Sequence, residues 1–252
     1  MGEVLDIYET NAAAFDSDRG RELMEKPYLD ELLAHLDTSR RGVLDVGCGA
    51  GDPIARYLIE QGCQVTGVDG APAMVEICAR KFPAMDWRVG DMRHLDLGQR
   101  FDAIIAWDSF FHLSAEAQRG MFPIFARHIA PRGVLLFTSG PAHGEAIGEL
   151  YGSALYHASL SAEEYRSLLT ENGFAVLRHV VEDPDCGRHT VWLAQAVQSA
   201  SGKVGIGFST RSTQKQKRRA VPRFFESRDG SSCRPACLII SRCRDALRAR
   251  AA

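Results

Sequence analysis

The sequence Val43-Leu44-Asp45-Val46-Gly47-Cys48-Gly49-Ala50-Gly51-Asp52 joins an apolar run to three glycines at alternate positions. Pro53 follows, and after it comes an apolar-periodic segment over 54–59. This order predicts a short buried strand, a tight turn and the start of a helix. Glycine allows a sharp turn and lets a ligand lie against the backbone, while a helix N-terminus favours anionic or strongly polar groups. The sequence therefore predicts a ligand-binding loop where the first strand ends.

A second strand-like run, Gln64-Val65-Thr66-Gly67-Val68-Asp69, ends in an acid. The spacing from Gly47 to Asp69 fits a βαβ unit whose second strand presents a carboxylate to a ribose. The glycines follow the pattern G-x-G-x-G, whereas the dinucleotide fingerprint requires G-x-G-x-x-G. An acid, Asp45, also stands two positions before the first glycine. The motif is therefore different from the dinucleotide fingerprint.

Asp45-x-Gly47-x-Gly49-x-Gly51, with Asp69 closing the second strand, resembles the class I S-adenosylmethionine-dependent methyltransferases, in their small-molecule branch. The resemblance covers residues 1–196 and continues at Gly90-Asp91-Met92, Phe101-Asp102-Ala103-Ile104-Ile105 and Pro131-Arg132-Gly133-Val134-Leu135-Leu136-Phe137. It is specific for the fold and the cofactor and weak for the substrate. It implies an α/β fold with a Rossmann-like, doubly wound, mostly parallel seven-stranded sheet, helices on both faces and an antiparallel edge strand. The alternative is that the glycines form only a structural turn in some other α/β protein.

Bulk features exclude some classes of protein. No run of eighteen apolar residues occurs, so no transmembrane helix is expected. The acidic, amphipathic N-terminus lacks the basic start and apolar middle of a signal peptide. The seven cysteines are an odd number without paired spacing, which fits a reducing cytoplasm.

The near-neutral net charge hides two different segments. Of the 30 Lys and Arg residues, 13 lie in 198–252, together with only 3 of the 32 Asp and Glu residues. We therefore expect an acidic methyltransferase domain over 1–197, with a helical lid at 1–40 and a Rossmann-like core at 41–197, and a basic tail at 198–252. The acidic core should repel nucleic acid. The tail is interpreted as disordered, with a nucleic-acid-binding arm or the product of a frame change as alternatives. Cys233, Cys237 and Cys243 lack a fourth ligand and paired spacing, so no metal site is expected.

Two helices are expected before the first strand, over 3–15 and from about 19 to 36. Asp16-Ser17-Asp18 offers N-caps for the second, and Pro27 interrupts it. By the resemblance, these helices form a lid over the cofactor. The candidate lid contacts are Tyr8, Phe15, Arg19 and Tyr28. Alternatively, the aromatic residues only pack the helices on the sheet.

Strand and helix patterns then alternate, which predicts a parallel sheet with helices on both faces. The strands are expected at 43–47, 64–69, 85–89, 101–107, 133–139, 174–181 and 189–196. The helices are expected at 53–61, 72–81, 114–128 with Pro123 as a disturbance, and 161–171 after the capping box Ser161-Ala162-Glu163-Glu164. Residues 139–160 are non-periodic and are expected to form an insert.

The resemblance implies roles in cofactor binding for residues at the ends of the first three strands. Gly47, Gly49 and Gly51 let the cofactor approach the backbone, and Asp45 holds its methionine amino group directly or through water. Asp69 accepts hydrogen bonds from the ribose hydroxyls, because an ionised carboxylate only accepts, and Gly70 leaves room for the sugar. Asp91 and Met92 contact the adenine, although Asp91 could also be a simple turn residue.

Ala106-Trp107-Asp108-Ser109-Phe110-Phe111-His112-Leu113 follows the fourth strand, at the sheet edge where ligands of open α/β sheets bind. Trp107 is a candidate wall of the cofactor pocket. Asp108 and His112 are the candidate catalytic groups, and His112 could take a proton from an acceptor oxygen or nitrogen. Alternatively, His112 only caps or packs the next helix. The insert supplies weaker substrate-binding candidates, which are His143, Tyr156 and His157.

We therefore expect a cytoplasmic methyltransferase that uses S-adenosylmethionine, releases S-adenosylhomocysteine and acts on a small molecule. The modest insert, the lid-like N-terminus and the acidic core favour a small acceptor. The sequence also lacks Asn-Pro-Pro-[Tyr/Phe], the signature of amino-methylating DNA and glutamine enzymes. Two alternatives stay open: an RNA or protein methyltransferase that uses the basic tail, and a module that binds S-adenosylmethionine without transferring its methyl group. The acceptor and the oligomeric state are not specified by the sequence.

Overall fold

The computed structural model describes residues 2–37 and 41–197. The expected tail at 198–252 therefore lies outside the described residues. Within them, no helix is long and apolar enough to cross a membrane. The elements, in chain order, are α1 (Gly2–Asp18), α2 (Lys26–Ala34), β1 (Gly42–Val46), α3 (Ile54–Glu60), β2 (Gln64–Asp69), α4 (Pro72–Lys81), β3 (Asp86–Val89), the 3₁₀ helix η1 (Met92–His94), β4 (Phe101–Ala106), the 3₁₀ helix η2 (Phe110–His112), α5 (Ala115–His128), β5 (Ile129–Ser139), β6 (Gly144–Leu150), β7 (Ser153–Ser159), α6 (Ala162–Glu171), β8 (Phe174–Asp183) and β9 (His189–Ala196).

Seven strands form one sheet in the order β3-β2-β1-β4-β5-β9-β8. The pairs from β3 to β5 are parallel, and β9 runs antiparallel to both β5 and β8. The predicted fold class, with antiparallel pairing at one side of a mostly parallel sheet, is confirmed. The chain order reverses between β1 and β4, and a ligand site is expected at the carboxyl ends of the strands there.

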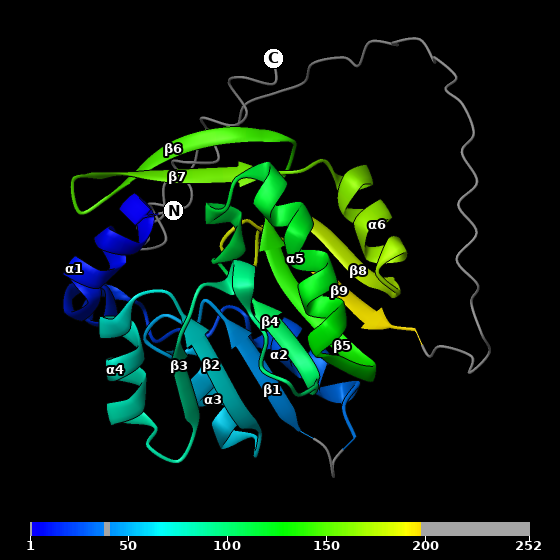
Figure 1. Ribbon diagram of the computed structural model, residues 1–252, viewed down its shortest axis with the longest axis horizontal. Helices are drawn as coiled ribbons and strands as arrows, with labels where there is room; N and C mark the ends of the chain where they lie inside the picture. The colour runs from blue at the N-terminus through cyan, green and yellow to red at the C-terminus, as the bar shows by residue number, and fades with distance from the viewer. Residues whose placement is uncertain (1, 38–40, 198–252) are drawn as a thin grey trace.

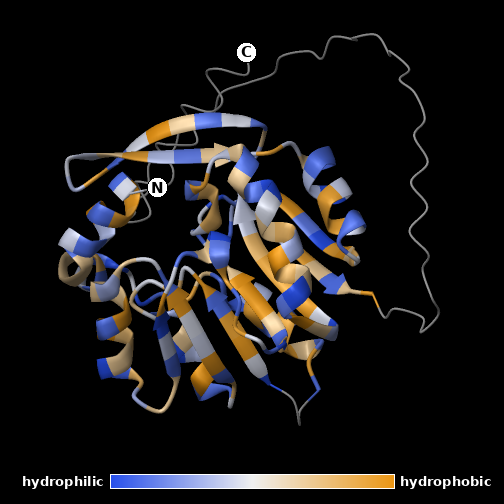
Figure 2. Cartoon of the chain, viewed as in Figure 1, coloured by the Kyte–Doolittle hydropathy of each residue, from blue (hydrophilic) through white to orange (hydrophobic). Residues whose placement is uncertain are grey.

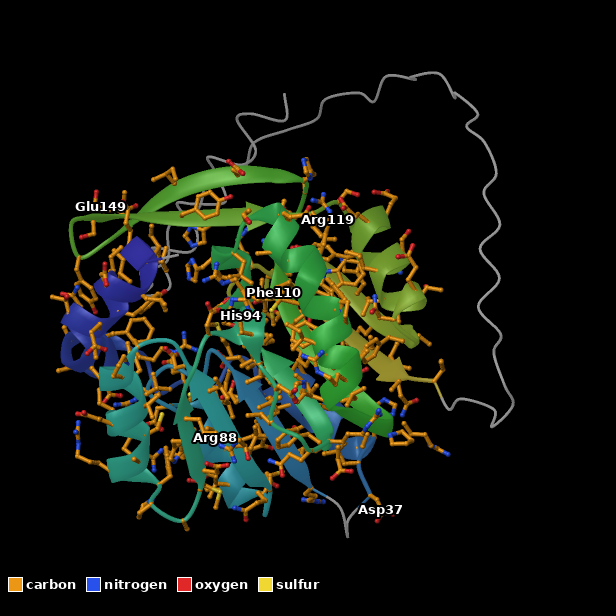
Figure 3. All side chains as sticks on the ribbon, in the orientation of Figure 1. Asp37, Arg88, His94, Phe110, Arg119 and Glu149 are labelled. Atoms are coloured by element: carbon orange, nitrogen blue, oxygen red, sulfur yellow. The ribbon has the colours of Figure 1, made fainter. Side chains whose placement is uncertain are left out.

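The sheet is covered on both faces, as expected for parallel strands buried between helices. On one face, the aromatic residues of α5 and α6 pack on the strands around Phe110, which Figure 3 labels near the centre of the molecule. On the other face, α2 and α3 contribute Tyr28, Leu32 and Leu58 to a second apolar cluster. Figure 2 shows the hydrophobic residues concentrated in the central strands.

The insert at 139–160 differs from the expectation, because β6 and β7 pair as an antiparallel hairpin. Only two of the seven residues of β6 are buried, Ala146 and Leu150, and Ile147 is exposed. This thin apolar face explains why the sequence shows no strand periodicity. Figure 1 shows the hairpin above the carboxyl ends of the parallel strands, reaching toward α1.

The predicted boundaries of the first two helices were wrong. Helix α1 continues through Asp16-Ser17-Asp18 to Asp18, although Asn11 interrupts its helical dihedral angles. Helix α2 begins only at Lys26, with Pro27 in its first turn, where proline has no N–H that the helix needs. The segment 19–25 is therefore a connection, and it carries Arg19 and Glu25 toward the sheet. The predicted cap at Ser161 is confirmed, since its hydroxyl accepts a hydrogen bond from the N–H of Glu164. Ser114 caps α5 in the same way, with the N–H of Ala117.

A shortened chain tests the division into domain and tail. We expect a chain that ends at Val197 to unfold cooperatively, with its melting midpoint within about 2 °C of that of the full chain. The reason is that β9 ends at Ala196, so all seven strands of the sheet that the structure describes lie within the shortened chain. Thermal unfolding followed by circular dichroism measures the midpoint. A loss of several degrees, or an insoluble product, would show that the tail stabilises the domain.

Candidate functional site

A cleft of about 880 Å³, counting the part open to solvent, lies where the carboxyl ends of β1, β2 and β4 meet α1 and η2. This size is within the range of small-molecule sites. It brings together most residues that the sequence analysis proposed. Those that line it are Tyr8, Phe15, Arg19, Asp45, Gly47, Gly49, Gly51, Asp69, Gly70, Met92, Trp107, Asp108 and His112.

The glycine loop forms the floor of the cleft. Gly47 has φ +78°, and a Cβ atom there would lie 2.3 Å from Cβ of Ser109. Ser109 itself donates a hydrogen bond from Oγ to the carbonyl of Val46 at 2.7 Å. The loop after β4 thus packs directly on the loop after β1, and only glycine fits between them. Sequence analysis missed Ser109, because a buried serine that contacts another loop leaves no local pattern.

Asp69 links the glycine loop to the start of α4. Its Oδ2 accepts from the N–H of Gly49 and its Oδ1 from the N–H of Ala71, each at 2.9 Å. Burial raises the pKa of Asp69, and these backbone N–H groups oppose the rise. Each oxygen has a second lone pair, so the carboxylate can still accept from a ligand hydroxyl.

Asp45 is buried beside the loop, and its side chain lines the cleft. Burial and the nearby Asp69 raise the pKa of Asp45 to about 7, while Arg19 opposes the rise. Asp45 and Asp69 are therefore two neighbouring acids, and the Arg19 guanidinium is the positive charge that acts on Asp45. A bound cation close to Asp45 would stabilise its charged form.

Arg19 is fixed from behind by a residue that sequence analysis missed. It donates from Nη2 to Oε1 of Glu25 at 3.0 Å, and the Glu25 side chain is fully buried. Burial raises the pKa of Glu25, and Arg19 opposes this. A glutamate just before a helix usually lies in solvent, so only the fold identifies this one as part of the site.

His112 lies at the end of η2 with both ring nitrogens engaged. Nδ1 is 2.9 Å from the carbonyl oxygen of Tyr156, and Nε2 is 3.2 Å from the hydroxyl of Tyr8. Because a carbonyl only accepts, Nδ1 carries the proton and Nε2 presents its lone pair. Burial lowers the pKa of His112. The ring is therefore held neutral, with its basic nitrogen on the side of α1.

Asp108 and Trp107 form the wall at the end of β4. Oδ2 of Asp108 is 2.9 Å from Nε2 of His189, a buried residue at the start of β9 that sequence analysis missed. The ring of His189 also packs against that of Trp107, with centroids 5.3 Å apart. The indole Nε1 of Trp107 is buried and has no hydrogen-bond partner among the residues that the structure describes.

Several candidates lie outside the lining of the cleft. Asp91 caps η1 and pairs with Arg93 at 2.5 Å, so its carboxylate is engaged away from the site. His143 is exposed in the turn before β6. Tyr28 is a core residue whose hydroxyl donates to Asp183, rather than a lid contact.

Tyr156 and His157 support the site without lining it. The carbonyl of Tyr156 holds His112, while its hydroxyl donates to Glu145 at 2.8 Å. The His157 ring packs on that of His112, with centroids 4.7 Å apart. The hairpin thus supports the catalytic candidate from behind.

Helix α1 forms one wall of the cleft, and the hairpin packs against this helix. Val4 and Ile7 of α1 pack against Leu150 and Leu155 of the hairpin. Figure 3 shows Glu149 at the end of the hairpin that lies near α1. The expected helical lid is thus supplemented by a second cover that the sequence did not predict, and this arrangement suits a ligand that is largely enclosed.

Comparisons with known proteins agree with this geometry. Residues 43–133 match the family model described as a methyltransferase domain. The dTDP-4-amino-2,3,4,6-tetradeoxy-D-glucose N,N-dimethyltransferase of Saccharopolyspora spinosa is 33% identical over 132 residues, which are 51% of this chain and 51% of that protein. The dTDP-3-amino-3,6-dideoxy-alpha-D-glucopyranose N,N-dimethyltransferase of Streptomyces fradiae is 27% identical over 197 residues, which are 74% of this chain and 73% of that protein. The chain thus spans about half the length of the first relative and about three quarters of the second.

A solved structure shows the same fold. The SAM-bound amino pentose methyltransferase from Micromonospora echinaspora superposes with a TM-score of 0.58 and is 19% identical, over 75% of this chain and 96% of that chain. At this identity the likeness concerns the fold alone.

Proposed function

Since this chain belongs to the class I S-adenosylmethionine-dependent methyltransferases, we propose that it transfers the methyl group of S-adenosylmethionine to a small-molecule acceptor. One observation carries the proposal: a single covered cleft joins the glycine loop, Asp45 and Asp69 to the neutral ring of His112. The first three features suit the methyl donor, and His112 suits proton removal from an acceptor.

The cleft has the chemistry that S-adenosylmethionine requires. The donor carries an ammonium, two ribose hydroxyls and an adenine, and it supplies a methyl group on a sulfonium. Asp45 would hold the ammonium, Asp69 would accept from the ribose hydroxyls, and Met92 would contact the adenine. The glycine at 47 leaves no side chain in the space beside Ser109. Trp107 and Gly70 would complete the walls of this subsite.

His112 would act as the base for the acceptor. The carbonyl of Tyr156 fixes the protonated Nδ1, so Nε2 can accept a proton. The hydroxyl of Tyr8 occupies Nε2 in this structure. A bound acceptor could displace the Tyr8 hydroxyl from Nε2, or it could give its proton to the Tyr8 hydroxyl while that hydroxyl gives its own proton to Nε2. Because the donor is already activated, positioning supplies most of the acceleration and the base removes the leftover proton.

The covers above the cleft favour a small acceptor over RNA or protein. Helix α1 and the hairpin β6–β7 meet through an apolar contact, so a bulky polymer would have to separate them. Two relatives are named as N,N-dimethyltransferases of amino sugars, which supports a small polar acceptor here as well. We place the protein in the cytoplasm, where its thiols would stay reduced.

Two measurements on the full chain test the proposal. Calorimetric titration with S-adenosylmethionine should show binding, and incubation with a library of small amines and alcohols should release S-adenosylhomocysteine. Binding without any turnover would favour a non-catalytic module. Turnover only with RNA or protein substrates, abolished by removing 198–252, would favour a macromolecular methyltransferase.

The affinity for S-adenosylmethionine should rise with pH and level off above about pH 7. The Asp45 carboxyl, with its pKa raised to about 7, must lose its proton before it can pair with the donor's ammonium. Below that pH the affinity should therefore increase by up to about tenfold per pH unit. By the same linkage, the empty protein binds more protons than its unfolded chain between pH 3.8 and about 7, so its free energy of unfolding should fall as pH rises across this window.

Titrations between pH 5.5 and 7.5 measure this dependence. Asp45→Asn should bind weakly with little dependence on pH. Asp102→Asn, at the opposite end of the sheet, serves as the matched control and should keep the wild-type profile. A wild-type affinity that does not change with pH would contradict the placement of the ammonium at Asp45.

A further inference from the structure

His189 is a buried histidine whose two ring nitrogens both face oxygen acceptors. Nδ1 lies 2.7 Å from the backbone carbonyl of Cys186, and Nε2 lies 2.9 Å from Oδ2 of Asp108. Only 3% of the His189 side chain and 12% of the Asp108 side chain are exposed. The carbonyl requires a proton on Nδ1, because it cannot donate. A second proton must then lie between Nε2 and the carboxylate.

That second proton belongs to the imidazole. A carboxylic acid is a much stronger acid than an imidazolium, so the proton stays on nitrogen and the contact is a charge-assisted N–H···O bond. His189 is therefore a buried cation and Asp108 a carboxylate. The pair is oriented, since Asp108 lines the cleft and His189 lies behind it.

Other contacts fix the carboxylate in this orientation. The backbone N–H of Asp108 donates to Oγ1 of Thr138 at 2.8 Å, and that hydroxyl is 3.3 Å from Oδ1 of Asp108. Asp108 has φ +46°, a left-handed backbone conformation that residues other than glycine adopt uncommonly. Strained backbone of this kind is often found at functional sites. The Asp108 carboxylate is thus held in one orientation at the end of β4, by a backbone conformation that costs some free energy.

Several charged groups lie near this anion. Arg19 faces the cleft but is paired with Glu25, and burial lowers the pKa of His112, which favours its neutral form. Both Asp108 and His189 act electrostatically on Glu25, so the two ion pairs are neighbours. The negative end of the Asp108–His189 pair is the one presented to a bound acceptor.

We propose that His189 is a positioning residue that holds Asp108 as a fixed carboxylate in the cleft, and that this carboxylate selects amines as methyl acceptors. The proposal rests on the proposed function and specifies its acceptor class. His189, which contacts Asp108 here, lies 81 positions away from it in the chain.

The electron bookkeeping of the transfer distinguishes amines from alcohols. The lone pair of a neutral amine forms the new N–C bond, and the C–S bond breaks with its electrons going to sulfur. The positive charge moves from sulfur to nitrogen, and a proton of the resulting ammonium then leaves to His112 or water. A carboxylate fixed beside the nitrogen stabilises the charge that develops there. An alcohol must instead lose its proton as the bond forms, and a nearby carboxylate disfavours the alkoxide character that results.

The test uses pairs of probes that share one carbon skeleton, such as glucosamine with glucose and benzylamine with benzyl alcohol. S-adenosylhomocysteine release is measured for the wild type, Asp108→Asn, His189→Gln and the double variant. We expect methylation of amines and not of their alcohol partners. Each single variant should lower kcat for the amine by at least about tenfold, while affinity for S-adenosylmethionine changes by no more than a few-fold. The double variant should be no slower than Asp108→Asn, because His189 acts through Asp108.

His179→Gln, a histidine of β8 stacked on Trp192 and away from the cleft, is the matched control and should keep wild-type kcat. Nitrogen–proton correlation spectra of the wild type should show protons on both ring nitrogens of His189 at pH 7.5. A neutral ring, additive losses in the double variant, preference for alcohols, or a protein that binds S-adenosylmethionine and methylates no probe amine would each overturn the proposal. Failure to bind S-adenosylmethionine at all would instead contradict the proposed function.

Discussion

Replacing His112 by alanine should lower the steady-state turnover of methylation by at least about tenfold, because a general base is usually worth about a hundred- to ten-thousand-fold and water would take the proton less effectively in its place. Affinity for S-adenosylmethionine should change by no more than a few-fold, because the donor's polar groups are assigned to Asp45 and Asp69. The ring is suited to the task by its contacts. Tyr156 fixes Nδ1 as the donor, and burial lowers the pKa of His112 so that Nε2 is unprotonated near neutral pH.

The competing interpretation is that His112 only connects η2 to the hairpin. In that case the variant should lose about 1 kcal/mol of stability, the value of one hydrogen bond, and keep its rate. Melting temperature, donor affinity and steady-state turnover should therefore be measured on the same preparation. His35→Ala, an exposed histidine after α2, is the control. A normal rate with a lowered melting temperature would exclude His112 as the base and shift attention to Asp108.

The fold and the arrangement of the glycine loop could be predicted from the sequence because their signals are local. Glycines at 47, 49 and 51 are required by the path of the backbone at one turn, and Asp69 ends its own strand. The strand over 64–69 and the helix over 72–81 match the structure at both ends. Such features depend on neighbours in the chain, so a single sequence carries them.

The surroundings of Asp108 and His112 could be predicted only in part, because their contacts are distant in the chain. His189 reaches Asp108 only because β9 inserts beside β5 in the sheet, and Glu25 reaches the site only because α1 continues to Asp18. The hairpin at 144–159 was missed for another reason: in its first strand only Ala146 and Leu150 are buried, so the sequence there shows no strand periodicity. The role of Asp91 stays a prediction: its strand-end position is typical of the family, and Arg93 pairs with its carboxylate here.

Asp69→Ala should weaken the binding of S-adenosylmethionine by about 1–3 kcal/mol, the cost of leaving polar partners unpaired, which corresponds to roughly a 5- to 150-fold higher Kd. The carboxylate has two tasks, since it holds the N–H groups of Gly49 and Ala71 and has lone pairs left for the ribose. Loss of the first task alone would loosen the glycine loop and lower stability. Loss of the second would show only in ligand affinity.

A ligand without the ribose 2′-hydroxyl separates the two tasks. In the wild type, S-(2′-deoxyadenosyl)homocysteine should bind more weakly than S-adenosylhomocysteine, whereas Asp69→Ala should bind both about equally, because the group that reads the hydroxyl is gone. Asp86→Ala on the neighbouring strand, where the aspartate pairs with exposed Arg88, is the matched control and should retain the preference. If Asp69→Ala still discriminates between the two ligands, the acid only braces the glycine loop, and the ribose must be bound by another group in the cleft.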